Sequence, residues 1–137
     1  MKLVAQENYS GCSVAVTAYI LGISYQEALG LFPPELAEEK GYFCHEIVEA
    51  LYKRGVYYNW GYIKSMGETR LRELIEVEGS VVYVDNSQGL PRGHYLVRTA
   101  DGWMNSWSNF REWPSEVAIV QELPGNPLYV VYPLESI

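Results

Sequence analysis

The sequence predicts an α+β fold in which N-terminal helices pack on a C-terminal antiparallel β-sheet. In the first half, apolar residues recur at helical spacing, and glycine or proline follows each such stretch. In the second half, the apolar stretches are shorter and rich in β-branched residues, as in strands. Between two of them stands Ala100-Asp101-Gly102, which is typical of a hairpin turn. Because the two patterns occupy different halves of the chain, we expect two segregated layers over one core.

Four helices are predicted in the first half. The first ends at Gly22, the third at Gly55 and the fourth near Gly79, since glycine readily adopts the left-handed conformation that ends many helices. The second opens at Ser24, where Glu27 three residues later completes a capping box, and it stops at a Pro-Pro pair. The predicted ranges are 13–21, 24–32, 43–54 and 69–77.

Short strands are predicted to follow. Their ranges are 80–84, 94–99, 103–107, 117–123 and 128–132, with 56–60 as a sixth candidate. No repeat, linker or charge block divides the chain. We therefore expect residues 1–137 to form a single domain.

The charge balance excludes one class of partner. The chain has 17 acidic and 10 basic residues, a net charge of −7. Binding to nucleic acid requires a basic face that neutralises phosphates, so no nucleic-acid partner is expected.

No apolar run approaches the ~20 residues that cross a bilayer, and the first residues lack a signal-peptide pattern. We expect a soluble, cytoplasmic protein without a membrane partner, whose oligomeric state does not follow from the sequence.

The two cysteines and two histidines are the scarcest reactive residues. Without an export signal, Cys12 and Cys44 are expected to be free thiols rather than a disulfide. Together with His45 and His94 they match no zinc-binding spacing, so we expect no metal and no other cofactor. Adjacent side chains on a helix point about 100° apart, which prevents Cys44 and His45 from forming a nucleophile–base pair with each other. Cys44 is predicted to be in the core and His45 on the surface.

Cys12 is predicted at the start of the first helix. Free N–H groups and the positive end of the helix dipole favour the thiolate there, and the thiolate is the nucleophilic form of sulfur. Gln6 stands six residues earlier. Its NH₂ group and the backbone N–H of Cys12 can both donate to the oxygen of a tetrahedral intermediate. The alternatives are a small buried apolar residue for Cys12 and an exposed polar residue for Gln6.

His94 opens a predicted strand, and two hairpin registers give it different neighbours. A four-residue turn at 99–102 puts Asn105 on the same face and diagonal to His94, about 7–8 Å away. A two-residue turn brings Asn109 opposite His94 instead, whereas a three-residue turn breaks the pairing. Either even register supplies an amide oxygen that orients the imidazole. Asp101, in the turn itself, is the weaker candidate for that role.

A thiol, an imidazole and an orienting amide, with a glutamine upstream, form the set that thiol acyl transfer requires. Here the sequence resembles the papain-like cysteine peptidases. The matching pieces are Gln6 six residues before Cys12, Gly93-His94, and Asn105-Ser106-Trp107. The short chain and the hairpin after Gly93-His94 look more like the compact C39-like members of bacteria and phages. Two departures are Ser13 after the thiol, where these groups have an aromatic or a glycine, and Asn105, where C39-like members more often have aspartate.

The resemblance implies a papain-like fold and a cysteine protease that cleaves a peptide or isopeptide bond of a protein or peptide substrate. It implies Cys12 as nucleophile, His94 as general base, Asn105 as the residue that orients it, and Gln6 in the oxyanion hole. Trp107, beside Asn105, is a candidate for the wall of the substrate cleft. Two alternatives stay open: an acyltransferase or amidase of transglutaminase or cell-wall type with the same triad, and a non-catalytic binding module.

Two further features have ordinary interpretations. Trp60, Trp103 and Trp113 are expected mainly in the core. The polar segment 85–92 leads into His94 and is either a rim over the cleft or a plain connecting loop.

Overall fold

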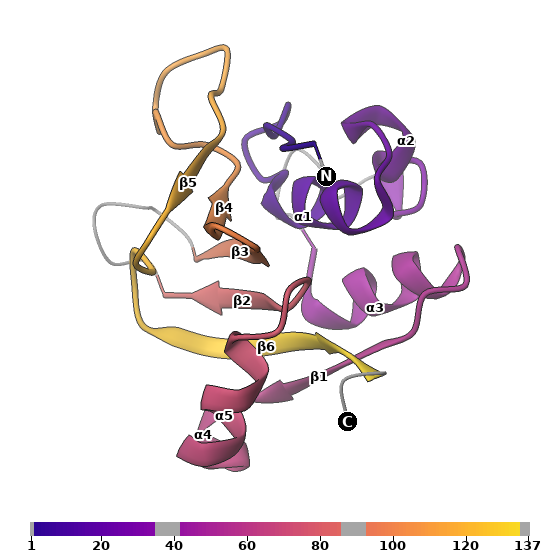
Figure 1. Cartoon of the computed structure of the whole chain (residues 1–137). Helices are drawn as coiled ribbons and strands as arrows, with labels where there is room; N and C mark the ends of the chain where they lie inside the picture. Colours follow the sequence, from indigo (N-terminus) through magenta and orange to yellow (C-terminus); the bar gives the residue numbers. More distant parts are fainter. Residues whose placement is uncertain (1, 35–41, 86–92, 135–137) are drawn as a thin grey trace.

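A computed structural model gives the fold and describes residues 2–34, 42–85 and 93–134. Its centre is a six-stranded antiparallel sheet in the order β1-β6-β2-β3-β4-β5, accompanied within those residues by five helices (Figure 1). The helices are α1 (Cys12–Leu21), α2 (Tyr25–Leu29), α3 (Cys44–Tyr52), α4 (Ile63–Met66) and α5 (Glu68–Ile75). The strands are β1 (Tyr58–Tyr62), β2 (Val81–Val84), β3 (His94–Thr99), β4 (Gly102–Asn105), β5 (Ala118–Val120) and β6 (Pro127–Pro133). The mixed helix-and-strand class is thus confirmed.

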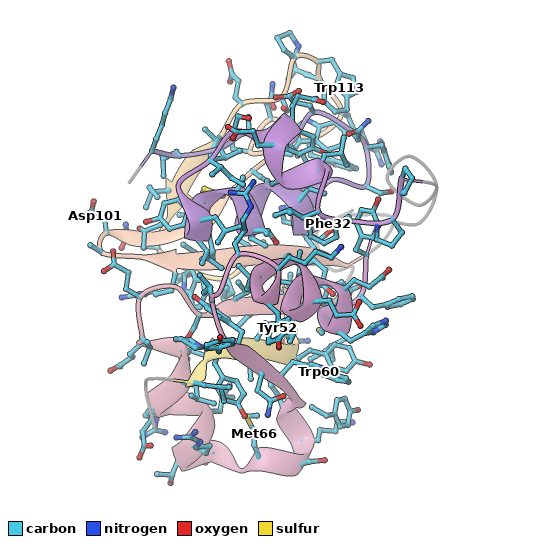
Figure 2. All side chains as sticks on the ribbon, turned by 90° about the vertical axis from the view of Figure 1, so that its right-hand side faces the viewer. Phe32, Tyr52, Trp60, Met66, Asp101 and Trp113 are labelled. Atoms are coloured by element: carbon cyan, nitrogen blue, oxygen red, sulfur yellow. The ribbon has the colours of Figure 1, made fainter. Side chains whose placement is uncertain are left out.

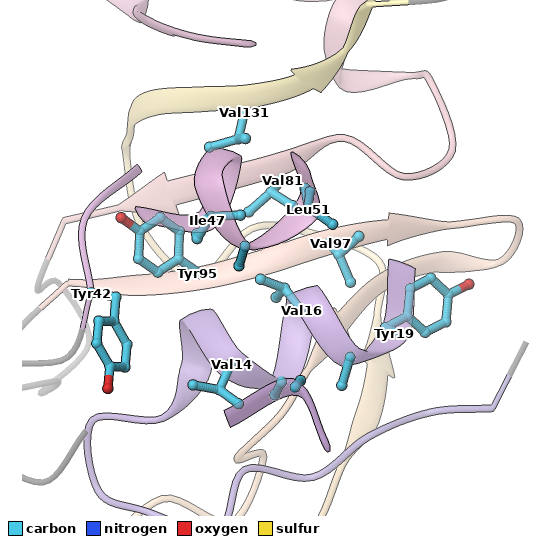
Figure 3. Packing of buried hydrophobic residues seen from close by; sticks show 14 of the residues in the cluster. Val14, Val16, Tyr19, Tyr42, Ile47, Leu51, Val81, Tyr95, Val97 and Val131 are labelled. Carbon is cyan, nitrogen blue, oxygen red and sulfur yellow. The ribbon is translucent and has the colours of Figure 1, made fainter. Parts of the chain in front are cut away.

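The larger core lies between α1, α3 and one face of the sheet. Apolar side chains of the two helices pack there on those of the central strands (Figure 3). The fully buried members include Val14, Val16, Ile47, Leu51, Val81, Val97 and Val131. Burial of this surface, at roughly 25 cal/mol per Å² of apolar area, is what holds α1 against the sheet.

The opposite face of the sheet has its own core, covered by α5. Leu74 packs there with a second set of strand side chains, among them Val82, Val84, Leu96 and Val130. Because successive residues of a strand point to opposite faces, the run of valines in β2 needs cover on both sides. The expectation of one helical layer on one sheet layer is therefore wrong: the helix predicted at 69–77 lies on the other face from α1 and α3.

Strand β1 also departs from the expected order, since it lies between α3 and α4 in the chain. It pairs antiparallel with β6, Trp60 facing Val131 across the ladder, and forms one edge of the sheet. The candidate strand at 56–60 is thus present, shifted two residues along. The short helix α4 that follows it was not predicted.

The helix ends follow the predicted signals. The backbone of Gly22 is left-handed, and its N–H bonds carbonyls of the last turn of α1. Ser24 and Glu27 form the full capping box of α2. That helix ends at Leu29, earlier than the prolines suggested. The N–H of Gly30 still bonds the carbonyl of Gln26, but Leu31 and Phe32 bond carbonyls only three residues back, as in a tightened last turn.

The hairpin of β3 and β4 adopts the first of the two predicted registers. Arg98 pairs with Trp103 and Val97 with Met104. Asn105 therefore lies on the same face of the hairpin as His94, at the position diagonal to it.

The tryptophans divide evenly between core and surface. Trp103 is 4% exposed, as expected, but Trp60 is 39% and Trp113 51% exposed, so their predicted burial is wrong. In the described ranges, no helix is both long enough and apolar enough to cross a membrane.

Candidate active site

Cys12 is the first residue of α1; the residue is half-buried and its thiol is not in a disulfide. Its sulfur forms a hydrogen bond with the side chain of His94 and accepts the backbone N–H groups of Tyr95 and Ser13. The donors come from the start of the helix and from β3, which the core holds against each other. The sulfur thus lies where both elements direct N–H groups at it.

The environment favours the charged pair. Burial alone raises the pKa of Cys12, but the hydrogen bond and charge of His94, with the two backbone N–H groups, bring that pKa below its ordinary value of 9.0. Burial also acts to lower the pKa of His94, and the bonds to Cys12 and Asn105 reverse this and raise it above 6.5. The two opposite shifts favour a thiolate beside an imidazolium.

Asn105 fixes the orientation of the imidazole. Its Oδ1 lies 2.9 Å from Nε2 of His94 and accepts the backbone N–H of Trp107 at 3.1 Å. Since the Trp107 N–H can only donate, the Asn105 side chain must present its oxygen, and Nε2 of His94 must carry a hydrogen. The other ring nitrogen, Nδ1, is left to face the Cys12 sulfur.

The other two candidates for this role lie elsewhere. Asn109 bonds the carbonyl of Pro114 and the N–H of Glu116, within its own loop. Asp101 lies beyond the far end of β3, and a six-residue strand separates its ends by roughly 16 Å. It stands at the edge of the molecule (Figure 2). Of the three candidates, Asn105 alone bonds His94 within the part of the chain that the structure describes.

Gln6 has contacts that differ from those expected. It is buried, its NH₂ donates to the carbonyls of Asn8 and Tyr9 at 3.0 Å each, and its Oε1 accepts the hydroxyl of Ser106 at 2.7 Å. Both amide hydrogens are therefore engaged, and the expected position as a free oxyanion donor is not what the structure has. Gln6 instead ties the turn before Cys12 to the segment after Asn105.

A cavity of about 440 Å³ opens at Cys12 and His94. Cys12, His94 and Gln6 line it, and Trp107 does so as predicted. Trp107 is held by a hydrogen bond from its ring N–H to the carbonyl of Glu112 at 2.9 Å. The remaining lining residues are mostly aromatic: Tyr9, Tyr42, Phe43, Trp60, Tyr83, Tyr95, Phe110 and Tyr129, with Ser10, Cys44, His45, Gly93 and Leu128.

Cys44 and His45 line the same cavity in different ways. Cys44 is buried in the core as predicted, with its sulfur 3.5 Å from the hydroxyl of Tyr95, and burial raises the pKa of its thiol. His45 is exposed and stacks on Phe43. The structure thus has one thiol whose charge is favoured and one whose charge is opposed.

Two glycines allow the close packing around the pair. A Cβ on Gly11 would lie 1.9 Å from the hydroxyl of Tyr25, which donates to Asn8 in the turn before Cys12. A Cβ on Gly93 would lie 2.1 Å from the ring of Tyr83. Both glycines are therefore required by close approach, not by an unusual backbone conformation.

Sequence reasoning missed the wall formed by Tyr83, Tyr129 and Trp60. These residues stand on β2, β6 and β1, which are neighbours in the sheet but not in the chain. The high tyrosine count, 12 of 137 residues, was the one available signal. Without the strand order, the tyrosine count could not indicate where in the fold these rings lie together.

Within the described residues, no group of three or more His, Cys, Asp or Glu side chains is arranged to hold a metal ion. The chain matches no protein-family model, and comparisons with curated proteins and with solved structures found no match. Its function is therefore argued from the site alone.

Proposed function

We propose that the protein is a thiol hydrolase that cleaves a peptide or isopeptide bond through an acyl-enzyme at Cys12. The observation that carries the proposal is the hydrogen-bonded series Cys12, His94 and Asn105 at the edge of the cavity. In this series Cys12 is the nucleophile, His94 is the base and Asn105 is the group that orients the base. Their order in the chain resembles that of the papain-like cysteine peptidases, and we place the fold with their compact C39-like members as part of the same proposal.

In the first step the Cys12 thiolate attacks the carbonyl carbon of the scissile amide. The sulfur–carbon bond forms, and the carbonyl π electrons move to oxygen. The His94 imidazolium then gives its Nδ1 proton to the amide nitrogen, the carbon–nitrogen bond breaks, and the amine leaves. The product is a thioester on Cys12 and a neutral His94.

In the second step neutral His94 acts as the base. It takes a proton from water, and the hydroxide formed adds to the thioester carbon. Collapse of that intermediate breaks the sulfur–carbon bond and releases a carboxylic acid. The thiolate and imidazolium are regenerated. Asn105 accepts from Nε2 throughout, so the ring stays aligned while its charge changes.

The oxyanion needs donors near the sulfur. The backbone N–H of Cys12 belongs to the first turn of α1, where N–H groups have no partner within the helix. For Gln6 to donate to the same oxygen, its amide must release the carbonyl of Asn8 or Tyr9. In this proposal Gln6 acts first as a positioning residue, through the turn that it holds before Cys12.

Selective alkylation tests the proposal. Chloroacetamide at pH 6–7 should label Cys12 at least tenfold faster than Cys44, with both sites quantified by peptide mass spectrometry. His94→Ala should remove the difference, because the thiolate loses its counter-charge. His45→Ala is the matched control and should leave it in place, since His45 has no bond to Cys12. Equal, slow labelling of the two cysteines in the native protein would contradict the proposal that the protein is a thiol hydrolase.

The acceptor is tested separately. An activated acyl ester should load Cys12, and intact-mass measurements should then follow loss of the acyl group in water alone and with an added amine. Release to the acid at a rate independent of amine supports the hydrolase. Preferential transfer to the amine assigns the same Cys12 and His94 to an acyltransferase.

A further inference from the structure

Among the residues that the structure describes, the lining of the cavity at Cys12 has no carboxylate, ammonium or guanidinium group. Charged residues make up 20% of the chain, yet no Asp, Glu, Lys or Arg is among the lining residues of the described structure. Away from the Cys12–His94 pair, a charged substrate group entering this lining loses its hydration without gaining a counter-charge, which disfavours it there. The cavity therefore suits an uncharged group.

Five aromatic residues with neighbouring rings extend from the cavity to the edge strand of the sheet and are here called the aromatic track: Tyr95, Tyr83, Tyr129, Trp60 and Tyr62. The ring centres of Tyr83 and Tyr95 are 4.8 Å apart, and those of Tyr83 and Tyr129 are 5.9 Å apart. Tyr129 in turn lies 6.0 Å from Trp60 and 5.5 Å from Tyr62. These separations are typical of interacting aromatic pairs.

The inner end of the track lies at the reacting atoms. Tyr95 and Tyr83 line the same cavity as Cys12, and the backbone N–H of Tyr95 bonds the Cys12 sulfur. A charge on Cys12 also raises the pKa of Tyr83, after the larger effect of burial. A substrate whose carbonyl is held at Cys12 therefore starts beside these rings.

The outer end of the track is open to solvent. Trp60 is 39% and Tyr62 40% exposed, although both are large aromatic residues in a regular strand. Figure 2 shows Trp60 projecting from the side of the molecule, above Met66. Trp60 and Tyr129 also line the cavity, so the exposed aromatic surface continues into it. The exposed rings of Trp60 and Tyr62 are thus accessible to a ligand.

We propose that the aromatic track selects peptide substrates that carry an uncharged aromatic or large aliphatic side chain close to the scissile bond, with Tyr129 as the specificity-determining residue. The inference rests on the proposed function, because it takes Cys12 as the point of attack. Tyr129 holds this role because it contacts the inner ring of Tyr83 and the outer rings of Trp60 and Tyr62.

The test uses N-acetyl-dipeptide chloromethyl ketones, which alkylate a thiol after binding as a peptide does. One series varies the residue next to the ketone and a second varies the residue before it, with Phe, Leu, Ala, Lys or Glu at that position and glycine at the other. The second-order rate of Cys12 labelling is measured for each. In at least one series, Phe and Leu should exceed Ala by tenfold or more, and Lys and Glu should not exceed Ala.

The variant Tyr129→Ala should lower the Phe-to-Ala rate ratio at least fivefold. The ratio cancels any general change in Cys12 reactivity. The matched control is Tyr132→Ala, the same truncation on the same strand, at a residue packed against the opposite core and beside Arg70. In Tyr132→Ala the Phe-to-Ala rate ratio should equal that of the native protein. Circular dichroism should show that both variants are folded.

The outcomes separate the two proposals. If chloroacetamide labels Cys12 selectively but the ketone series is flat or favours Lys or Glu, the substrate inference is overturned and the hydrolase is not. An unchanged ratio in Tyr129→Ala overturns the role of the track. Loss of Cys12 selectivity toward chloroacetamide in the native protein overturns both.

Discussion

Replacement of Asn105 by alanine removes the group that accepts from Nε2 of His94 at 2.9 Å. A hydrogen bond to a charged group contributes about 1.5–3 kcal/mol, and one pKa unit corresponds to about 1.4 kcal/mol. Because this bond favours the imidazolium, its loss lowers the pKa of His94 and, through the lost counter-charge, raises that of Cys12. If the whole bond energy is lost, the population of the thiolate–imidazolium pair falls roughly tenfold or more.

The assay is the pH dependence of Cys12 alkylation by chloroacetamide. In the native protein the rate should increase with pH at a midpoint below 9.0, since the pKa of Cys12 is lowered. In Asn105→Ala the midpoint should move to higher pH, and the rate at pH 6 should fall tenfold or more. Cys44, whose pKa is raised by burial, should react slowly in both proteins.

Asn109→Ala is the matched control for this prediction. The same amide is removed four residues away, where it bonds Pro114 and Glu116 instead of the imidazole. Its Cys12 midpoint should equal that of the native protein. An unchanged midpoint in Asn105→Ala, with folding intact, would refute the reasoning, because the orienting bond would then contribute nothing to the charged pair.

Three predictions concern stability and are measured by urea unfolding. Gly93→Ala brings a Cβ to 2.1 Å from the Tyr83 ring, and such overpacking should cost about 1–3 kcal/mol. Leu74→Ala empties the centre of the α5 core and should cost about 2–5 kcal/mol, the larger values applying if the cavity does not collapse. Ser24→Ala removes the hydroxyl that accepts the Glu27 N–H and should cost about 1 kcal/mol. A free-energy change below 0.5 kcal/mol in Leu74→Ala would contradict the second core.

The local structure could be predicted from the sequence because its signals are local. Gly22 ends α1 and Ser24 opens α2, each through contacts within a few residues. The β3–β4 register was reduced to two even alternatives by side-chain alternation alone, and the turn selected the one that faces Asn105 toward His94. Cys12, His94 and Asn105 could be named as candidates from the sequence for the same reason, since each was indicated by local signals.

The arrangement of the sheet could not be predicted in this way. Strand β6 lies between β1 and β2, so Tyr129 meets Trp60 and Tyr83 only after three distant segments pair. Placement of α5 on the second face is likewise not a local property: Val82 and Val84 require cover on that face, but the sequence does not say which helix supplies it. The contacts of Gln6 could not be predicted either, because the sequence does not show that the carbonyls of Asn8 and Tyr9 accept its amide hydrogens.

Both thiols belong to first residues of helices, but one is paired with His94 and the other is buried in the core, and this difference makes chemical selectivity a measure of folding. In the unfolded chain, Cys12 and Cys44 lose their different surroundings, and both react as ordinary thiols. Folding activates the first and shields the second, so the two rates move in opposite directions across one transition. The ratio of labelling at Cys12 to labelling at Cys44 therefore reports the fraction of native molecules, without a spectroscopic probe or an added reporter group.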